Sequence, residues 1–291
     1  MPEFPVPAKL AEAAGRDSEL RGRLADLPAV VADAASRWSL RIGAPFQPGG
    51  QCSWVAPAGA DLVVKVVFRG GTGEDRDEAA GLQHWNGNGV VRLQAVHDGA
   101  AARVLLLERC RPGTRLSLAL PEREQDKIVA GLLRRLWVTV PAAHAFRPLA
   151  DMCEQWALEF ERDYAAANPA GRLDPGLART GADLLRTLPQ TAGRQALLCT
   201  DLHADNVLAA RREPWLVIDP KPYVGDPAYD VVQHMLNCDR LASDPAGLAQ
   251  RMAELTGEDS SRVRLWLFAR CVQESVGCPD LALAARRLAP G

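Results

Sequence analysis

Residues 197–220, LLCTDLHADNVLAARREPWLVIDP, constrain the fold of this chain more than any other stretch. Two short apolar runs at 207–209 and 215–218 flank a polar connection that is typical of a hairpin turn. Antiparallel pairing of the two runs would bring Asn206, just before the first run, close to Asp219, just after the second. We therefore predict that the oxygen atoms of these two side chains share one cation.

The predicted cation is Mg²⁺, because this hard ion takes oxygen ligands and usually combines one or two protein carboxylates with substrate phosphates. Asp201 precedes Asn206 in the loop ahead of the hairpin, where its carboxylate would face a hydroxyl group and act as a base. A D-x-x-x-x-N spacing followed by a metal-binding Asp is the arrangement of a kinase catalytic loop. The stretch therefore predicts phosphoryl transfer.

The residues that a kinase needs for its nucleotide lie upstream in the expected order. Lys65 stands in the middle of an apolar run, where an unpaired ammonium group would be costly. Glu78 falls on the helix predicted to follow, and a Lys65–Glu78 pair would orient the ammonium group towards the phosphates. The turn before this run contains Gly49 and Gly50, whose backbone N–H groups would approach phosphate closely.

The hydrophobic periodicity predicts a sheet followed by helices. An amphipathic helical region at 8–38, broken near Pro28, precedes short strands, and Asp98-Gly99 is a hairpin turn. The expected strands are 54–56, 62–68, 90–96 and 103–108, with a helix opening at 73–75, and the expected later helices are 121–138, 149–167, 176–188, 227–238, 244–255 and 259–277. We predict an α+β fold of two lobes, 1–108 and 109–291, with a small-molecule cleft where they join.

Composition argues against several other classes of protein. The net charge of −2 over 291 residues disfavours a broad nucleic-acid interface. No stretch reaches the roughly 20 apolar residues of a membrane span, and the first residues lack the apolar core of a signal peptide. The seven cysteines are scattered without a C-x-x-C pair, which indicates reduced thiols. We expect a cytoplasmic monomer without nucleic-acid or membrane partners.

Two other interpretations of the same residues stay open. Asp201, His203 and Asp205 would suit the transition-metal site of a metallohydrolase, although such sites usually need further His ligands. A chain with a kinase-like fold can also bind nucleotide without transferring phosphate. Nucleotide-dependent turnover would separate an enzyme from such a binding protein.

The chain resembles the aminoglycoside phosphotransferase family, a branch of the protein-kinase-like fold, over residues 40–280. The motifs LLCTDLHADNVL, WLVIDPKPYVGDPAYD and LLLERCRPGT are similar to those of the streptomycin 6-kinase and hydroxyurea phosphotransferase group. The resemblance implies an ATP- and Mg²⁺-dependent O-phosphotransferase that modifies a cationic aminoglycoside antibiotic, with streptomycin as the first choice. Hydroxyurea or another small metabolite is the alternative acceptor.

The resemblance also implies a role for each matching position. Asp201 is the catalytic base, Asn206 and Asp219 bind Mg²⁺, and Lys65, held by Glu78, contacts the phosphates of ATP. The remaining assignments are a phosphate-covering turn with Gly49, Gly50 and Ser53, a hinge for the nucleotide base at Glu108, Arg109 and Cys110, and loop support from His203 and Asp230. Cys199-Thr200 precede the base where many family members carry His-Gly.

The acceptor pocket is the least constrained part of the sequence. Streptomycin carries guanidinium groups, so its pocket should present carboxylates to their forked donors. The candidates are Glu154, Glu159, Glu161 and Asp163 on one predicted helix, Asp205 beside the catalytic loop, and Glu274 on a late helix. Solvated helix faces are charged in any case, so none of these residues is favoured individually.

Overall fold

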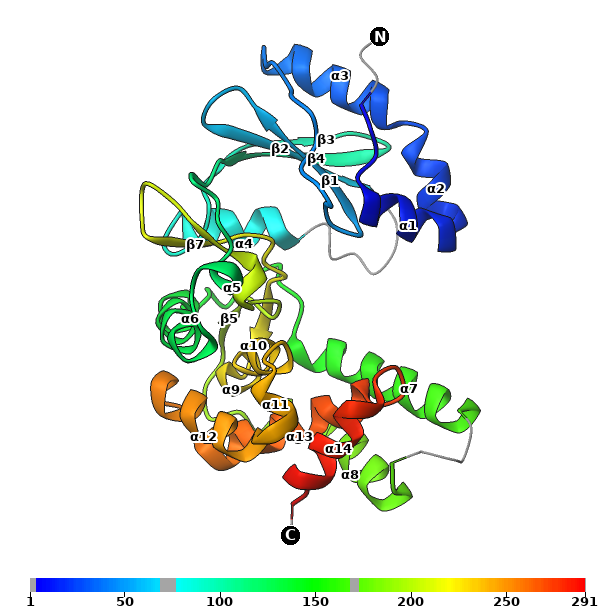
Figure 1. Cartoon of the computed structure of the whole chain (residues 1–291), viewed down its shortest axis with the longest axis vertical. Helices are drawn as coiled ribbons and strands as arrows, with labels where there is room; N and C mark the ends of the chain where they lie inside the picture. Colours follow the sequence, from blue (N-terminus) through cyan, green and yellow to red (C-terminus); the bar gives the residue numbers. More distant parts are fainter. Residues whose placement is uncertain (1–3, 69–76, 168–172, 291) are drawn as a thin grey trace. The chain divides into compact units, whose positions relative to one another are not determined.

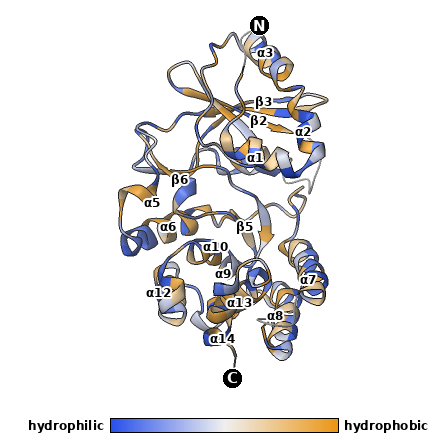
Figure 2. Cartoon of the chain, turned by 45° about the vertical axis from the view of Figure 1, so that its right-hand side comes forward, coloured by the Kyte–Doolittle hydropathy of each residue, from blue (hydrophilic) through white to orange (hydrophobic). Residues whose placement is uncertain are grey.

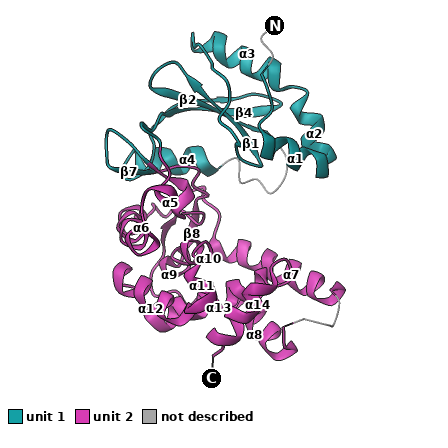
Figure 3. Ribbon diagram, viewed as in Figure 1, with its two compact units in different colours: residues 1–113, 209–216 teal, residues 114–208, 217–291 magenta. Residues whose placement is uncertain are grey.

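The computed structural model describes residues 4–68, 77–167 and 173–290 (Figure 1). The chain divides into two compact units, residues 1–113 with 209–216 and residues 114–208 with 217–291 (Figure 3). The division falls shortly after the expected lobe boundary at 108/109, and a hairpin segment from the second half of the chain groups with the first unit. The helix start expected at 73–75 lies outside the described residues.

The first unit contains a four-stranded antiparallel sheet in the order β1-β2-β4-β3. Its strands are β1 (Ser53–Ala58), β2 (Leu62–Phe68), β3 (Leu93–Asp98) and β4 (Ala102–Glu108). The strand expected at 90–96 begins only at Leu93, because a turn with Gly87 and Gly89 at positive φ carries the chain up to that point. The other expected strands are confirmed.

Three helices cover one face of this sheet: α1 (Ala8–Arg16), α2 (Ser18–Leu24) and α3 (Leu27–Arg37). Leu10 and Val31 from these helices share a buried core with Trp54 and Val64 from the sheet. The expected break near Pro28 is confirmed, since α2 ends at Leu24 and α3 begins at Leu27 with Pro28 in its first turn. A proline is well tolerated there because the first-turn N–H has no partner within the helix. A second break, at Asp17 between α1 and α2, was not expected.

The opposite face of the sheet carries Lys65. Successive side chains of a strand point to opposite faces, so Val64 and Val66 enter the core under the helices while Lys65 points the other way. Helix α4 (Asp77–Trp85) supplies Glu78 to that ammonium group. The alternation of side chains along β2 therefore keeps the Lys65 ammonium group out of the apolar core.

The second unit is mainly helical. Its helices are α5 (Leu116–Ala119), α6 (Glu122–Leu136), α7 (Leu149–Ala166), α8 (Pro175–Thr187), α9 (Pro227–Asp230), α10 (Val232–Leu236), α11 (Arg240–Ser243), α12 (Pro245–Thr256), α13 (Ser260–Glu274) and α14 (Pro279–Leu288). Helix α13 packs against α7, α8, α9, α10, α12 and α14, and its apolar residues are visible in Figure 2. Its Trp266 and Phe268 are fully buried.

Most of the expected helices in this unit are confirmed, with ends that shift by a few residues. The helix expected at 227–238 is wrong as a single element, because the chain forms α9 and α10 with a break at Val231. The break follows Asp230, whose carboxylate turns inward to bind backbone N–H groups at residues 199 and 200. Helices α5, α11 and α14 were not expected.

Short strands and turns hold the polar loops of the second unit. Strand β5 (Ala196–Leu198) pairs antiparallel with β8 (Tyr223–Gly225), and β6 (Val207–Ala209) pairs with β7 (Trp215–Val217), which confirms the predicted hairpin. Two 3-10 turns, η2 (Pro189–Thr191) and η3 (Ala204–Asn206), complete this region. None of the described helices is long and apolar enough to cross a membrane.

Candidate active site

Asp230 anchors the loop that leads to Asp201. The Asp230 carboxylate is fully buried and accepts hydrogen bonds from the backbone N–H of Cys199 at 2.9 Å and of Thr200 at 2.6 Å. It also accepts one from the indole N–H of Trp137 at 3.0 Å. Burial raises the pKa of Asp230 to about 6, against the opposing effect of these three donors. The loop is therefore anchored immediately before Asp201.

The Asp201 carboxylate is contacted on both of its oxygen atoms. Gln233 donates its side-chain N–H to Oδ1 at 3.1 Å, and the Lys221 ammonium group lies 3.3 Å from Oδ2. The side chain of Asp201 is 19% exposed, so it is shielded but open to a small molecule. This loop geometry suits a base that meets a substrate hydroxyl group.

The β6–β7 hairpin brings the two predicted metal ligands together, as the sequence predicted. The backbone N–H of Ile218 donates to the Asn206 carbonyl at 2.9 Å, so Asp219 follows directly after the residue that pairs with Asn206. Asp219 has a positive φ of 54°, an uncommon conformation for a residue other than glycine. Such a strained backbone is found preferentially at functional sites.

The donor set at the end of the hairpin fits Mg²⁺. The Asn206 side-chain N–H₂ donates to the Asp201 carbonyl at 3.0 Å, which directs its amide oxygen elsewhere. That oxygen and the Asp219 carboxylate are hard ligands of the kind that Mg²⁺ prefers. These two residues would hold the ion, with its other positions left to phosphate and water.

His203 lies within the same loop but makes no close contact with the base. Its Nε2 atom is 4.0 Å from Asp201 Oδ1, and its buried Nδ1 has no hydrogen-bond partner among the described residues. Burial lowers the pKa of His203, in opposition to the nearby Asp201 carboxylate. A lowered pKa favours the neutral form of the imidazole.

Lys65 and Glu78 form the predicted pair. The Lys65 ammonium group donates to both Glu78 carboxylate oxygens, at 2.7 and 2.8 Å. The side chains are 7% and 6% exposed, so the pair is held almost entirely out of water. Two opposite charges buried at this distance hold each other in one geometry.

The predicted hinge is fastened to the rest of the first unit. The N–H of Glu108 donates to the Arg92 carbonyl, and the N–H of Arg109 donates to the Asp61 carbonyl. Two of the N–H groups in this segment are therefore occupied within the protein. A nucleotide base would have to use the remaining backbone groups around Cys110.

Arg212, at the tip of the β6–β7 hairpin, binds the Glu108 side chain. Its guanidinium group donates to both Glu108 oxygens at 2.9 to 3.1 Å and to the carbonyl groups of Gly87 and Val90. Burial alone would raise the pKa of Glu108, but the hydrogen bonds from Arg212 and from the backbone of Arg92 hold it below its usual value. The hairpin is thus tied to the hinge strand.

The predicted phosphate-covering turn has a structural reason for one of its glycines. Gly49 has a φ of +76°, and a Cβ atom there would lie 2.5 Å from the Cβ of Pro7. The N–H of Lys9 also donates to the Pro48 carbonyl, so the amino-terminal segment packs onto this turn. Gly50 has only the Ser53 hydroxyl near it, at 3.8 Å. Packing with Pro7 therefore accounts for Gly49 without a ligand.

The acidic residues considered for the acceptor pocket differ in their surroundings. Glu154 and Glu161 of α7 both bind Arg186 of α8, with the shortest distances at 3.1 and 2.7 Å. Asp163 binds Arg162, and Glu159 accepts a hydrogen bond from Gln155. The other two candidates are Asp205, which accepts from Ser117 at 2.5 Å, and Glu274, which binds Arg270 at 2.8 Å. Glu154 and Glu161 therefore share the single positive charge of Arg186.

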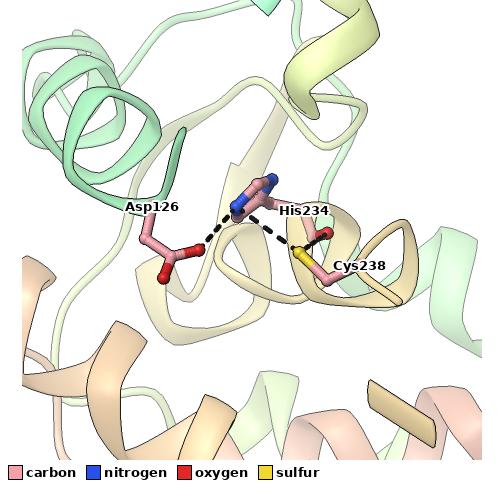
Figure 4. A group of neighbouring side chains, drawn as sticks. All are labelled: Asp126, His234 and Cys238. Carbon is pink, nitrogen blue, oxygen red and sulfur yellow. Dashed lines mark hydrogen bonds and ion pairs between the residues drawn. The ribbon is translucent and has the colours of Figure 1, made fainter. Parts of the chain in front are cut away.

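Three metal-ligating residue types meet elsewhere, at Asp126, His234 and Cys238 (Figure 4). This is the one such group among the described residues, so Asp201, His203 and Asp205 do not gather around one point as the metallohydrolase interpretation requires. At Asp126, guanidinium groups already occupy the carboxylate: it accepts from Arg240 at 2.7 Å and from Arg251 at 2.6 Å. Burial also raises the pKa of the Cys238 thiol to about 12, which disfavours a thiolate ligand.

Three residues at the site were missed by sequence reasoning: Lys221, Gln233 and Arg212. Lys221 follows Asp219-Pro220 within the motif WLVIDPKPYVGDPAYD without a signal of its own, and Gln233 lies within an ordinary helical pattern. Arg212 is one of two adjacent arginines in a polar turn. No local pattern distinguishes these side chains, because their partners are distant in the sequence.

Comparison with known proteins places the chain in a family. A family model described as aminoglycoside/hydroxyurea antibiotic resistance kinase matches residues 46–280. The hydroxyurea phosphotransferase of Kitasatospora aureofaciens is 34% identical, with 98% of this chain and 84% of that protein covered. The streptomycin 6-kinase of Streptomyces glaucescens is also 34% identical, with 94% and 90% covered.

Solved structures share the fold at lower identity. Aminoglycoside phosphotransferase APH(3'')-Id from Streptomyces rimosus, in complex with ADP and streptomycin, matches with a TM-score of 0.59 at 18% identity, covering 85% of this chain and 98% of that one. Choline kinase LicA from Streptococcus pneumoniae matches with a TM-score of 0.61 at 13% identity, covering 90% and 97%. The expected protein-kinase-like α+β fold is confirmed. With the family model matching most of its length, the chain belongs to the aminoglycoside/hydroxyurea antibiotic resistance kinases.

Proposed function

We propose that this kinase transfers the γ-phosphoryl group of ATP to a hydroxyl group of streptomycin or a closely related cationic aminoglycoside, with Mg²⁺ as the metal. Modification of a hydroxyl group in this way would protect a cell from the antibiotic. The proposal rests on the β6–β7 hairpin, which pairs Asn206 with Ile218 and so brings the next residue, Asp219, close to Asn206. Asn206 in turn follows Asp201 by five positions and donates to its carbonyl group. The relatives named for streptomycin 6-kinase activity support this choice of acceptor.

In the proposed reaction Asp201 orients the acceptor hydroxyl group and takes its proton. The acceptor oxygen bonds to the γ-phosphorus, the bond from that phosphorus to the bridging oxygen breaks, and its electron pair leaves with ADP. Asn206 and Asp219 would hold Mg²⁺, which neutralises phosphate charge when bound. Lys65, held by Glu78, would contact the phosphates. Positioning and electrostatics therefore supply most of the rate enhancement.

The acceptor pocket should use carboxylates that the protein does not already neutralise. Glu154 and Glu161 are weaker candidates, because Arg186 binds both of them. Glu274 is likewise bound by Arg270, at 2.8 Å. Asp205 accepts from the neutral Ser117 hydroxyl and lies 3.9 Å from Arg115, so its carboxylate, 51% exposed, is the one best placed to meet a guanidinium group of the substrate. The seven cysteines form no disulfide bond, which supports a reducing compartment, and we propose a cytoplasmic monomer.

The test is a phosphorylation assay in which mass spectrometry detects the product. Streptomycin, a 2-deoxystreptamine aminoglycoside and hydroxyurea are offered in parallel with Mg-ATP. We expect a gain of one phosphoryl group on streptomycin. Hydroxyurea is included because a relative of equal identity is named for that activity.

Asp201→Asn is the informative variant, and it should lower kcat by at least about 10³-fold because the base is lost. Asp183→Asn, which changes an exposed carboxylate on α8, is the matched control and should match the unmodified protein. Transfer to hydroxyurea alone would replace the proposed acceptor. Mg-ATP binding without transfer to any acceptor would contradict the proposed function.

A further inference from the structure

The segment around Lys221 is fixed to the residues just before Asp201. The Lys221 N–H donates to the Cys199 carbonyl at 2.9 Å, and its own carbonyl accepts from the Thr200 hydroxyl at 2.5 Å. The same two residues, 199 and 200, are held on their N–H side by Asp230. The backbone of Lys221 is therefore locked to the loop that carries Asp201.

From this anchored backbone the Lys221 side chain reaches the Asp201 carboxylate. Its Nζ atom lies 3.3 Å from Oδ2, while Gln233 of α10 donates to Oδ1 at 3.1 Å. The two donors come from different parts of the second unit and each takes a different oxygen. The torsion that turns an Asp carboxylate has only broad preferences of its own. Contacts on both carboxylate oxygens would therefore fix one orientation of the Asp201 side chain, which its own torsional preferences do not fix.

We propose that Lys221 is a positioning residue for phosphoryl transfer, which together with Gln233 sets the Asp201 carboxylate in the orientation that the acceptor hydroxyl group requires. This inference rests on the proposed role of Asp201 as the base. It assigns a function to the lysine of the Asp219-Pro220-Lys221 motif that is separate from metal binding. Lys221 acts through the carboxylate and not on the nucleotide.

The structural alternative is an ordinary ion pair near the surface. The Lys221 side chain is 41% exposed, and exposed ion pairs typically add little stability. Stability measurements alone would not separate the two roles. A positioning role predicts instead a change in kcat, because a displacement of about 1 Å at a reacting group can cost about 10²-fold in rate.

The first experiment compares Lys221→Met and Lys221→Arg with the unmodified protein in the phosphorylation assay. Lys221→Met should lower kcat by about 30- to 100-fold and leave the KM for Mg-ATP within about threefold. Lys221→Arg keeps a cationic donor and should recover part of the loss. An unchanged kcat in Lys221→Met, or a rise, would overturn the inference.

The second experiment asks whether Lys221 acts through Asp201. If it does, adding Lys221→Met to Asp201→Asn should lower the residual rate by less than about threefold, since the oriented group is already gone. A further loss as large as that of the single variant would overturn the inference, because Lys221 would then act on another group.

Chemical rescue gives a readout that a structural role would not produce. A variant with Lys221→Cys, Cys52→Ser and Cys278→Ser carries its new thiol at a partly exposed position and lacks the two exposed natural cysteines. The other cysteines are buried, and burial raises the pKa of Cys110, Cys153, Cys238 and Cys271 to about 12 and that of Cys199 well above its usual value. Thiols of this kind react slowly with alkylating agents.

Treatment of this variant with 2-bromoethylamine converts the thiol introduced by Lys221→Cys into a thioether analogue of the lysine side chain, with loss of bromide. We expect kcat to rise at least tenfold, while the Cys52→Ser, Cys278→Ser protein treated in the same way should not change. Complete alkylation without recovery of kcat would overturn the inference. Failure of the unmodified protein to transfer phosphate to any acceptor would instead overturn the proposed function, and this inference with it.

Discussion

Glu78 and Lys65 are each nearly fully buried, and each charge is stabilised by the other at 2.7 to 2.8 Å. Glu78→Gln removes the carboxylate charge that holds the Lys65 ammonium group and should leave that group in a less defined position. We expect the KM for Mg-ATP to rise by at least about tenfold and the free energy of unfolding to fall by about 3 kcal/mol. Steady-state kinetics and urea unfolding measure the two effects.

A double replacement separates the effect of the Lys65–Glu78 pair on ATP binding from its effect on stability. Lys65→Met with Glu78→Leu removes both charges and fills the space with apolar atoms, which is often neutral for stability. This variant should unfold close to the unmodified protein but fail to turn over. A double variant that retained normal kcat would contradict the phosphate-binding role of Lys65.

At the scale of elements, the β6–β7 hairpin depends on Arg212 at its tip. Arg212→Met would remove the hydrogen bonds to Glu108 and to the carbonyl groups of Gly87 and Val90, leaving the partly buried Glu108 carboxylate with the backbone N–H of Arg92 but without its guanidinium partner. We expect a loss of about 3 kcal/mol in the free energy of unfolding. Arg211→Met is the control, since Arg211 is exposed and adjacent. Equal urea midpoints for the two variants would refute the role of Arg212.

The β6–β7 hairpin is one of the features that could be predicted from the sequence. Its two strands and their turn are local, so alternation and turn residues were enough to predict the pairing of Asn206 with the segment before Asp219. The Lys65–Glu78 pair was predicted because a lysine in an apolar strand requires a partner. Both predictions follow from physical requirements that can be recognised within a short stretch of the sequence.

The contacts that sequence reasoning missed join residues far apart in the chain. Arg212 meets Glu108 across 104 positions, and Gln233 meets Asp201 across 32. Polar side chains of this kind have no local signature, because their partners are set by how the helices and loops pack.

For the whole molecule, the buried network around Asp126 predicts how stability depends on pH. Burial alone would raise the pKa of Asp126, but hydrogen bonds from His234, Arg251 and Arg240 lower it from 3.8 to about 2. The folded-state pKa lies below the unfolded value, so this stabilisation is complete above about pH 4 and is lost as the pH falls towards 2. The expected change is roughly 2 kcal/mol.

Asp126→Asn tests this dependence by unfolding at several pH values. The variant should be much less stable than the unmodified protein at pH 7, because Arg251 loses its carboxylate partner and Arg240 keeps only Glu122. The difference should shrink by roughly 2 kcal/mol between about pH 4 and about pH 2. Asp151→Asn, at an exposed position, is the control. A difference that stayed constant over this range would contradict the assignment.

Asp230 contributes with the opposite sign. Burial raises its pKa from 3.8 to about 6, so the folded state keeps its proton to a higher pH than the unfolded state. This contribution to stability is full below about pH 4 and declines as the pH rises to about 6. Asp126 loses its contribution to stability as the pH falls, and Asp230 loses its contribution as the pH rises. Together the two groups therefore favour a maximum in the free energy of unfolding in mildly acidic solution.

The hairpin that completes the first unit also bears on how the protein is made. A ribosome releases residues in order, so Glu108 leaves the exit tunnel 104 positions before its partner Arg212. At about 5–20 residues per second this delay is on the order of 5–20 s. Throughout that interval the Glu108 carboxylate at the end of the nascent sheet lacks its guanidinium partner, and the first unit is complete only after residue 216 has been synthesised.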